Sequence, residues 1–300
     1  MSEIVLHHYE MSPFGTVIRL ALGLKGLHWK SVDAPVISPK PDLSALTGGY
    51  ERIPVLQIGA DIYCDTDCIT EALEARCPQP SLYPDPLGAA GKMIALWAGG
   101  AWFMPTVGAS LGVNPDALPA EFWEDRGKRF GMRRETFLPA VPHLQSQFAG
   151  GASVVMSALD DGRAFIAGDH AGHADFALYV NIRFVALAGM TPADFSPQVA
   201  AWYERVEAIG YGDFEGWTGE QAIEHALQSK PVGGCSVAEG GVFSTGQRVS
   251  VTTDSPDPAT VEGTLVGLSD RRISLSRVDE RAGEVHVHFP RLGQIMTPVD

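Results

Sequence analysis

The sequence predicts an α/β domain, an all-helical domain and a small all-β module, in that order along its 300 residues. Short apolar runs typical of strands alternate with helical patterns over the first quarter of the chain. After a proline-rich stretch at 78–86, helical spacing alone continues. Towards the C-terminus the apolar residues alternate again, as they do in strands. The expected boundaries are 1–78 for the α/β domain, 88–229 for the helical domain and 235–300 for the β module.

Composition and charge favour a folded intracellular protein. The chain is 45% hydrophobic and 19% charged, which is typical of globular proteins. Its net charge of −14 repels phosphate backbones and acidic lipid surfaces, so we expect neither nucleic acid nor membrane as a partner. The four cysteines show no disulfide framework, and no secretory signal pattern is visible at the N-terminus. We therefore expect a cytoplasmic location.

One uncharged stretch, from Met93 to Val113, is long enough to span a bilayer. Several glycines and Pro105 interrupt it, and its flanks show no strong charge asymmetry. We expect a buried, kinked core helix here, with a transmembrane span as the alternative.

The first functional pattern lies where a strand turns into a helix. Residues 4–9 are predicted to form a strand, and apolar residues from Val17 to Leu24 follow at helical spacing. The segment 12–15 between them places Ser12 at the helix N-terminus. Unpaired N–H groups and the helix dipole make such a position favourable for an anion, including a thiolate. The alternative is that Ser12 only caps the helix.

A second pattern covers residues 53–69. Pro54 opens a predicted strand, 59–61 supply a hairpin turn, and Asp65 and Thr66 stand at the start of another helix. A further strand is predicted at 29–32, before this pattern.

Together, these two patterns resemble the N-terminal thioredoxin-like domain of the glutathione transferase superfamily. Residues 12–26 are similar to the active-serine segment of tau-type members, and 53–69 to the segment that carries the family's proline and its acid–hydroxyl pair. The resemblance covers 3–77 well and 88–210 weakly, and it leaves out the C-terminal module. It implies a glutathione transferase fold, a homodimer, and glutathione as co-substrate.

The resemblance also implies a role for each part of a glutathione site. Asp65 and Thr66 would bind the γ-glutamyl end with a carboxylate, a hydroxyl and free N–H groups. A cis bond before Pro54 would expose the backbone of Ile53 to the cysteinyl part. Ser12 would donate a hydrogen bond to the thiolate and act as the catalytic residue.

Three further residues complete the implied site, and one departure lies outside it. Lys40 and Arg52 are candidates for the glycine carboxylate, and Phe14 is a further contact. In the helical domain, Gly172 stands where the family has a serine or threonine cap. Asp175 can still accept a hydrogen bond from the Gly172 N–H, so half of the capping box is expected to survive.

The predicted function is that of a glutathione transferase-like enzyme, which activates the thiolate for attack on an electrophilic small molecule. Ser12 and Gly15 occupy the two cysteine positions of a redox motif, which argues against thiol–disulfide exchange. His286 and His288 share one strand face, but no third ligand is apparent, so no metal is expected; a solvated strand face is the simpler interpretation.

Two alternatives to this function stay open. One is a non-catalytic binding protein of the same fold. The other is a glutathione-dependent isomerase, etherase or dehalogenase. The identity of the second substrate is not predicted, because it depends on pocket shape. The C-terminal module resembles no part of the family pattern. We expect it to lie against the helical domain, away from Ser12, so that its deletion leaves glutathione binding nearly intact.

Overall fold

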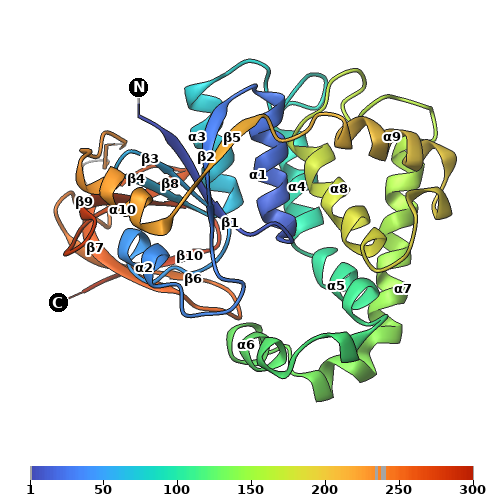
Figure 1. The fold of residues 1–300 in the computed structure, drawn as a ribbon. Coiled ribbons are helices and arrows are strands. Elements are labelled where there is room, and N and C mark those ends of the chain that lie inside the picture. Colours follow the sequence, from blue (N-terminus) through green and yellow to red (C-terminus); the bar gives the residue numbers. More distant parts are fainter. Residues whose placement is uncertain (1, 234–235, 238–240, 300) are drawn as a thin grey trace. The chain divides into compact units, whose positions relative to one another are not determined.

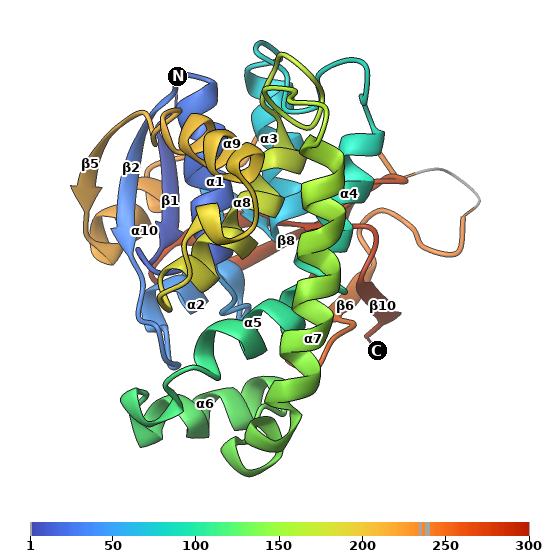
Figure 2. The ribbon, with the colours of Figure 1, turned by 90° about the vertical axis from the view of Figure 1, so that its right-hand side faces the viewer.

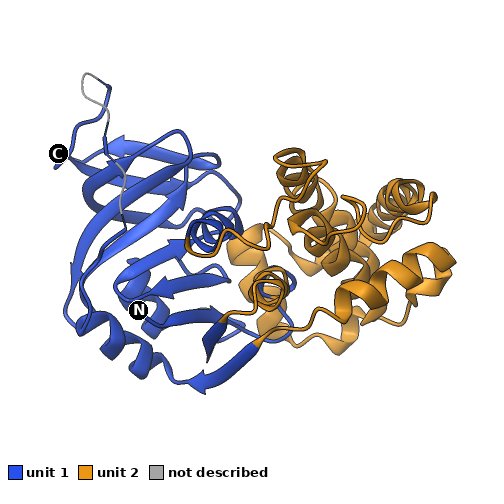
Figure 3. Ribbon diagram, turned by 90° about the horizontal axis from the view of Figure 1, so that it is seen from above, with its two compact units in different colours: residues 1–15, 28–75, 213–300 blue, residues 16–27, 76–212 orange. Residues whose placement is uncertain are grey.

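The computed structural model describes residues 2–233, 236–237 and 241–299, which form two compact units (Figure 3). The first unit contains 1–15, 28–75 and 213–300, and the second contains 16–27 and 76–212. This division differs from three consecutive domains. The C-terminal residues from 213 onward, including the last helix of the expected helical domain, belong with the N-terminal α/β elements.

A ten-stranded sheet forms the centre of the first unit (Figure 1). Its strand order is β10-β6-β7-β8-β9-β4-β3-β1-β2-β5. β1 is parallel to β2 and antiparallel to β3, as the strand–helix–strand pattern of the sequence predicts. The strands up to residue 217 are β1 (Ile4–His8), β2 (His28–Asp33), β3 (Val55–Ile58), β4 (Asp61–Cys64) and β5 (Asp213–Trp217).

Among the described residues of the first unit, four helices begin: α1 (Pro13–Leu24), α2 (Pro41–Thr47), α3 (Thr66–Arg76) and α10 (Gly219–Leu227). A capping box opens α10. The Gln221 N–H donates to Thr218 Oγ1 at 3.2 Å, and the Thr218 N–H donates to Gln221 Oε1 at 2.8 Å. α10 places Ile223 and Ala226 in the core of this unit.

The C-terminal module consists of β6 (Arg248–Thr253), β7 (Thr260–Leu268), β8 (Arg272–Asp279), β9 (Gly283–Pro290) and β10 (Gln294–Pro298). β6 and β7 alternate between buried and more exposed residues, as predicted, whereas β8 and β9 each contain a run of consecutive buried residues. β9 pairs in parallel with β4, with Ile62 opposite Val287, so the module continues the N-terminal sheet. We expected the module to lie against the helical domain, but it belongs to the same sheet and the same unit as the N-terminal α/β elements.

The module joins the N-terminal sheet because the two parts share one apolar core. Leu46, Tyr50 and Val55 belong to one apolar cluster with buried residues of the module, including Val261 and Val287. Pairing with β9 also covers β4, which would otherwise be an exposed sheet edge. Sequence periodicity identified the strands but carried no information about which edge they would join.

The second unit is helical, and α7 is its longest helix (Figure 2). Between residues 120 and 159 the chain forms two helices, α6 and α7, rather than one continuous helix. Gly131 ends α6 in the left-handed region at φ 67°, a conformation that glycine adopts without strain. The helices of the second unit are α4 (Ala90–Gly99), α5 (Phe103–Leu111), α6 (Ala120–Phe130), α7 (Arg134–Leu159), α8 (His173–Ala186) and α9 (Pro197–Glu207), with short 3₁₀ turns η1 (Pro115–Ala117) and η2 (Pro192–Asp194).

Asp175 organises the start of α8. Its Oδ2 accepts a hydrogen bond from the Gly172 N–H at 3.0 Å, which confirms the predicted half of the capping box. Its Oδ1 accepts from the Ile166 N–H and from Trp202 Nε1, both at 2.8 Å. Burial raises the pKa of Asp175, although these donors oppose the change. A single buried carboxyl group thus joins three segments of the unit.

The uncharged stretch from Met93 to Val113 forms α4 and α5, bent by 41°. Within the described part of the chain, each helix alone falls short of what a membrane span requires, and only this bent pair meets the length and composition limits together. The stretch is kinked, as expected, but not fully buried. Met93 is 72% exposed and Leu96 is 50% exposed on α4.

Candidate active site

Strand register brings most of the predicted site to one end of the sheet. His7 near the end of β1 pairs with Val55 at the start of β3, and Val55 pairs with Cys64 at the end of β4. The loop after β1, the residues before β3 and the residue after β4 therefore leave the sheet side by side. The predicted site residues in these segments are Ser12, Phe14, Arg52, Ile53, Pro54, Asp65 and Thr66.

The Ile53–Pro54 peptide bond is cis, as the resemblance implied. Ile53 is partly buried and packs against the core cluster of the first unit. Its backbone lies where the chain enters β3.

Ser12 caps α1. Its Oγ accepts a hydrogen bond from the Gly15 N–H at 3.0 Å, and the side chain is buried, with 2% exposure. A Cβ on Gly15 would lie 3.2 Å from that oxygen, so only glycine allows this close approach without a shift. The geometry confirms the cap, and it also places a hydroxyl at the positive end of the helix. Phe14, half-buried, is the second residue of α1.

Asp65 caps α3 in an unusual backbone conformation. Its φ is 75°, in the left-handed region that aspartate and asparagine tolerate better than most residues. Its Oδ1 accepts a hydrogen bond from the Asp67 N–H at 2.9 Å. Such conformations cost about 1–3 kcal/mol and concentrate at functional sites. Thr66 follows as the first residue of α3, and both side chains are partly exposed.

Lys40 lies inside the first unit, at the N-terminus of α2, with 1% exposure. Its backbone N–H and the Ser44 hydroxyl both donate to Glu51 Oε1 at 2.9 Å. Burial alone would raise the pKa of Glu51, but hydrogen bonds from Ser38, the Lys40 backbone and Ser44 outweigh it, and the pKa is lowered. Glu51 thereby ties α2 to the segment that leads into β3.

Arg52 has partners in the C-terminal module. Its Nη2 donates to Ser255 Oγ and, at 3.1 Å, to the Asp257 carbonyl oxygen. Its Nε lies 3.5 Å from Asp257 Oδ2. The sequence did not predict these partners, because they lie more than 200 positions from Arg52 in the chain. The acidic side chain of Asp257 was a local signal for a basic partner. The role of Arg52 towards a glycine carboxylate stays a prediction.

The two histidines of β9 contact protein groups. His288 Nε2 lies 2.9 Å from Asp61 Oδ1, and its Nδ1 lies 2.8 Å from Ser274 Oγ. His286 Nδ1 lies 3.0 Å from the Gly233 carbonyl oxygen. His288 is fully buried, so the expected solvated strand face is wrong for this residue. No group of three metal-ligating side chains is found within 2–233, 236–237 and 241–299.

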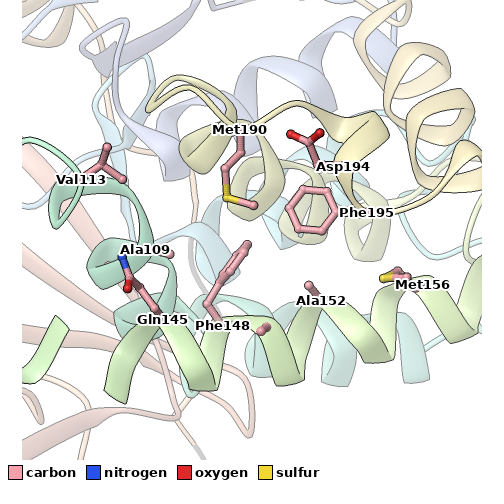
Figure 4. Close-up of a pocket in the computed structure, with 10 residues that line it drawn as sticks. Ala109, Val113, Gln145, Phe148, Ala152, Met156, Met190, Asp194 and Phe195 are labelled. Carbon is pink, nitrogen blue, oxygen red and sulfur yellow. The ribbon is translucent and has the colours of Figure 1, made fainter. Parts of the chain in front are cut away.

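An apolar pocket lies within the second unit, with a volume of about 390 Å³. Figure 4 shows Phe148 extending from α7 towards Met190 and Phe195. Trp97, Trp102 and Phe103, the aromatic residues of α4, α5 and the segment between them, do not line it. Its lining residues are Ala109, Val113, Gln145, Phe148, Ala149, Ala152, Met156, Met190, Asp194 and Phe195.

We expect acid to destabilise the fold through buried histidines. His7 lies in β1 with its Nε2 3.0 Å from Gln57 Oε1, and burial lowers its pKa from 6.5 to about 4. The folded state therefore binds a proton less readily than the unfolded chain. Stability is complete above about pH 6.5 and falls as the pH drops towards 4, by roughly 3 kcal/mol for His7 at 1.4 kcal/mol per pKa unit.

Urea unfolding at several pH values tests this expectation. Burial also lowers the pKa of His173 to about 4, so it adds a change of the same sign. The variant His7→Gln should flatten the pH dependence, whereas His143→Gln, at an exposed position, should leave it unchanged. A free energy of unfolding that stays constant between pH 7 and 5 would contradict the burial of a neutral His7.

The comparisons with known proteins agree with this geometry. Residues 6–81 match the family model of the glutathione S-transferase N-terminal domain. A solved GST-like protein from Pseudomonas syringae is 35% identical, with a TM-score of 0.82, and the match covers 100% of both chains. The chain belongs to the glutathione S-transferase superfamily. No curated protein matches the sequence.

More distant members share the fold of this glutathione S-transferase superfamily protein over part of its length. A glutathione S-transferase from Methylobacterium radiotolerans, solved with glutathione sulfonate, is 20% identical, with a TM-score of 0.54, over 71% of this chain and 97% of its own. A tau class enzyme from mango is 17% identical, with a TM-score of 0.51, over 75% and 97%. The Pseudomonas protein, by contrast, matches over the full length, which includes β6–β10.

Proposed function

We propose that this member of the superfamily binds glutathione in its first unit and activates the thiol for attack on an electrophilic small molecule. The observation that carries the proposal is the placement of Ser12, Ile53 and Asp65 in three segments that leave the sheet at one end. Two of these segments open helices whose N-termini favour negative charge. The relative solved with glutathione sulfonate supports this choice of ligand.

In this proposal, the parts of glutathione meet different groups. The γ-glutamyl ammonium pairs with the Asp65 carboxylate, and the neighbouring carboxylate accepts from Thr66. The backbone of Ile53 pairs with the cysteinyl part as a strand edge would. The Ser12 hydroxyl turns its proton towards the sulfur, and the α1 N-terminus adds its positive potential, so that the thiolate is favoured over the thiol.

The negative charge of Asp65 is expected to strengthen the binding of glutathione. Asp65→Asn keeps a residue that tolerates positive φ and caps a helix, but removes the negative charge. A lost charge-assisted hydrogen bond is worth about 1.5–3 kcal/mol, so we expect the Kd for glutathione to rise roughly tenfold or more in calorimetric titration. Glu74→Gln on the same helix is the matched control. Equal affinity of Asp65→Asn and the unaltered protein would remove Asp65 from the site.

One observation favours the alternative of a binding protein without catalysis: Ser12 is buried and already serves as a helix cap. Glutathione binding without turnover across a panel of electrophiles would support this alternative. Turnover by isomerisation, or by ether or halide cleavage, would instead identify another use of the same thiolate.

We also propose a cytoplasmic homodimer. The exposed Met93 and Leu96 on α4 offer apolar surface for subunit contact. Light scattering of the purified chain at micromolar concentration measures the oligomeric state directly.

A further inference from the structure

The C-terminal module contacts the segment between α2 and β3 at several points. Arg277 donates a hydrogen bond to the carbonyl oxygen of Ala45, the fifth residue of α2. At Gly48, with φ 81°, an added Cβ would lie 2.8 Å from Arg277 Nε and 3.0 Å from Val261. The Tyr50 ring meets Phe289 edge-on, with centroids 6.0 Å apart. Residues 45–50 are thus packed against the module along their length.

Arg52, just after this segment, makes a further contact with the module, and this contact is the most directional. Arg52 is bound by the β6–β7 loop through a hydroxyl, a carbonyl oxygen and a carboxylate. The Arg52 and Asp257 side chains are 23% and 17% exposed. A guanidinium held by several acceptors in a largely buried place has few other orientations open to it. The loop therefore fixes Arg52, the residue immediately before Ile53.

We propose that the β6–β7 loop, residues 254–259, is a positioning element of the glutathione site, and that Asp257 acts through Arg52 on the backbone of Ile53. This inference rests on the proposed function, because it assigns the loop a role at that same site. Asp257 is a positioning residue and does not touch the thiol.

The loop would act through the entropy cost of ordering the segment around Ile53. Binding through backbone groups of Ile53 requires that segment to hold one conformation, and an unfixed segment must be ordered when the ligand arrives. The Arg52–Asp257 contact orders it beforehand. Its loss should therefore weaken ground-state and transition-state binding alike and leave the chemical step at saturation unchanged.

The test compares three full-length variants. Asp257→Asn removes the charge, and Asp257→Glu keeps it. Glu262→Gln is the matched control, because Glu262 makes an exposed ion pair with Arg248, at 3.4 Å, within the same module. Each is measured by calorimetric titration with glutathione, by steady-state kinetics, and by hydrogen exchange of the peptide covering 48–56 without ligand.

For Asp257→Asn we expect a roughly fivefold to tenfold rise in Kd and KM for glutathione, a kcat within about twofold of the starting value, and faster exchange over 48–56. Asp257→Glu should restore the binding, and Glu262→Gln should resemble the unaltered protein. If the contact only stabilised the fold, its loss would not raise KM while leaving kcat unchanged.

Two results would overturn the proposal. One is unchanged exchange over 48–56 together with an unchanged Kd. The other is tighter binding by Asp257→Asn, which would mean that Asp257 competes with glutathione for Arg52. If the unaltered protein binds no glutathione, the proposed function fails on that ground. The exchange of the ligand-free variants then decides separately whether Asp257 orders 48–56.

Discussion

Removal of residues 233–300 is expected to unfold the first unit and to abolish glutathione binding. This expectation replaces the one drawn from the sequence, in which the module was dispensable. The truncated chain would leave β4 as an unpaired edge. It would also expose the apolar residues that β6–β9 now cover, among them Leu46, Val55 and Ile62.

The expected loss of burial free energy is large compared with the stability of a domain. Burial of one large apolar side chain contributes about 1.5–3 kcal/mol, while a whole domain is stable by only about 5–15 kcal/mol. Truncation would expose several fully buried side chains and remove the whole apolar face of the module. The free energy of burial lost in this way exceeds the stability of the domain. A truncated protein is therefore expected to be insoluble or to lack a cooperative unfolding transition.

Two further variants keep this prediction informative if the truncated chain cannot be purified. Val287→Ala, in the middle of β9 opposite Ile62, should lower the free energy of unfolding by about 2 kcal/mol. Deletion of 294–300 removes only β10, a largely exposed edge strand, and should have a small effect. A truncated chain that binds glutathione and unfolds at the midpoint of the full chain would show that the shared core is not needed.

Ser12→Ala is expected to reduce turnover by roughly two orders of magnitude while the affinity for glutathione changes little. A positioned donor to a developing or bound anion is worth about 2.7–4 kcal/mol, and this donor acts on the sulfur only. The substitution also removes the α1 cap, because Ser12 Oγ accepts from the Gly15 N–H. Some loss of stability, about 1 kcal/mol, is expected for that separate reason.

A second helix cap distinguishes the two effects. Ser196 Oγ accepts a hydrogen bond from the Val199 N–H at 3.1 Å, the same kind of contact at the start of α9. Ser196→Ala should lower stability by a similar amount without the loss of turnover. Ser12→Thr retains a hydroxyl and should keep much of the activity. Equal turnover by Ser12→Ala and Ser196→Ala would leave Ser12 with a structural role only.

Local signals were enough for the first part of the fold and for the position of several predicted site residues in it. The order of strands and helices up to α3 followed from apolar spacing and from turn residues. The contact between Asp175 and the Gly172 N–H was also predicted, because a capping box spans only four residues. Ser12, Ile53 and Asp65 lie at one end of the sheet because strand register places the strand ends there.

Contacts between residues far apart in the sequence could not be predicted from local patterns. Arg52 and Ser255 are 203 positions apart, and neither residue type specifies the other. Likewise, an alternating pattern in β9 predicts a half-buried strand, but it does not identify β4 as its neighbour. Pairing of this kind depends on shape and core volume across the whole unit.

The state of the bound thiol tests the central claim most directly. A cysteine thiol in water has a pKa of about 8.5, and its thiolate can be followed by ultraviolet absorbance during a pH titration of the glutathione complex. If Ser12 and the α1 N-terminus stabilise the thiolate, the bound thiol should titrate at least one unit lower, and Ser12→Ala should return it towards the free value. Bound glutathione that titrates like free glutathione in the unaltered protein would contradict thiol activation at this site.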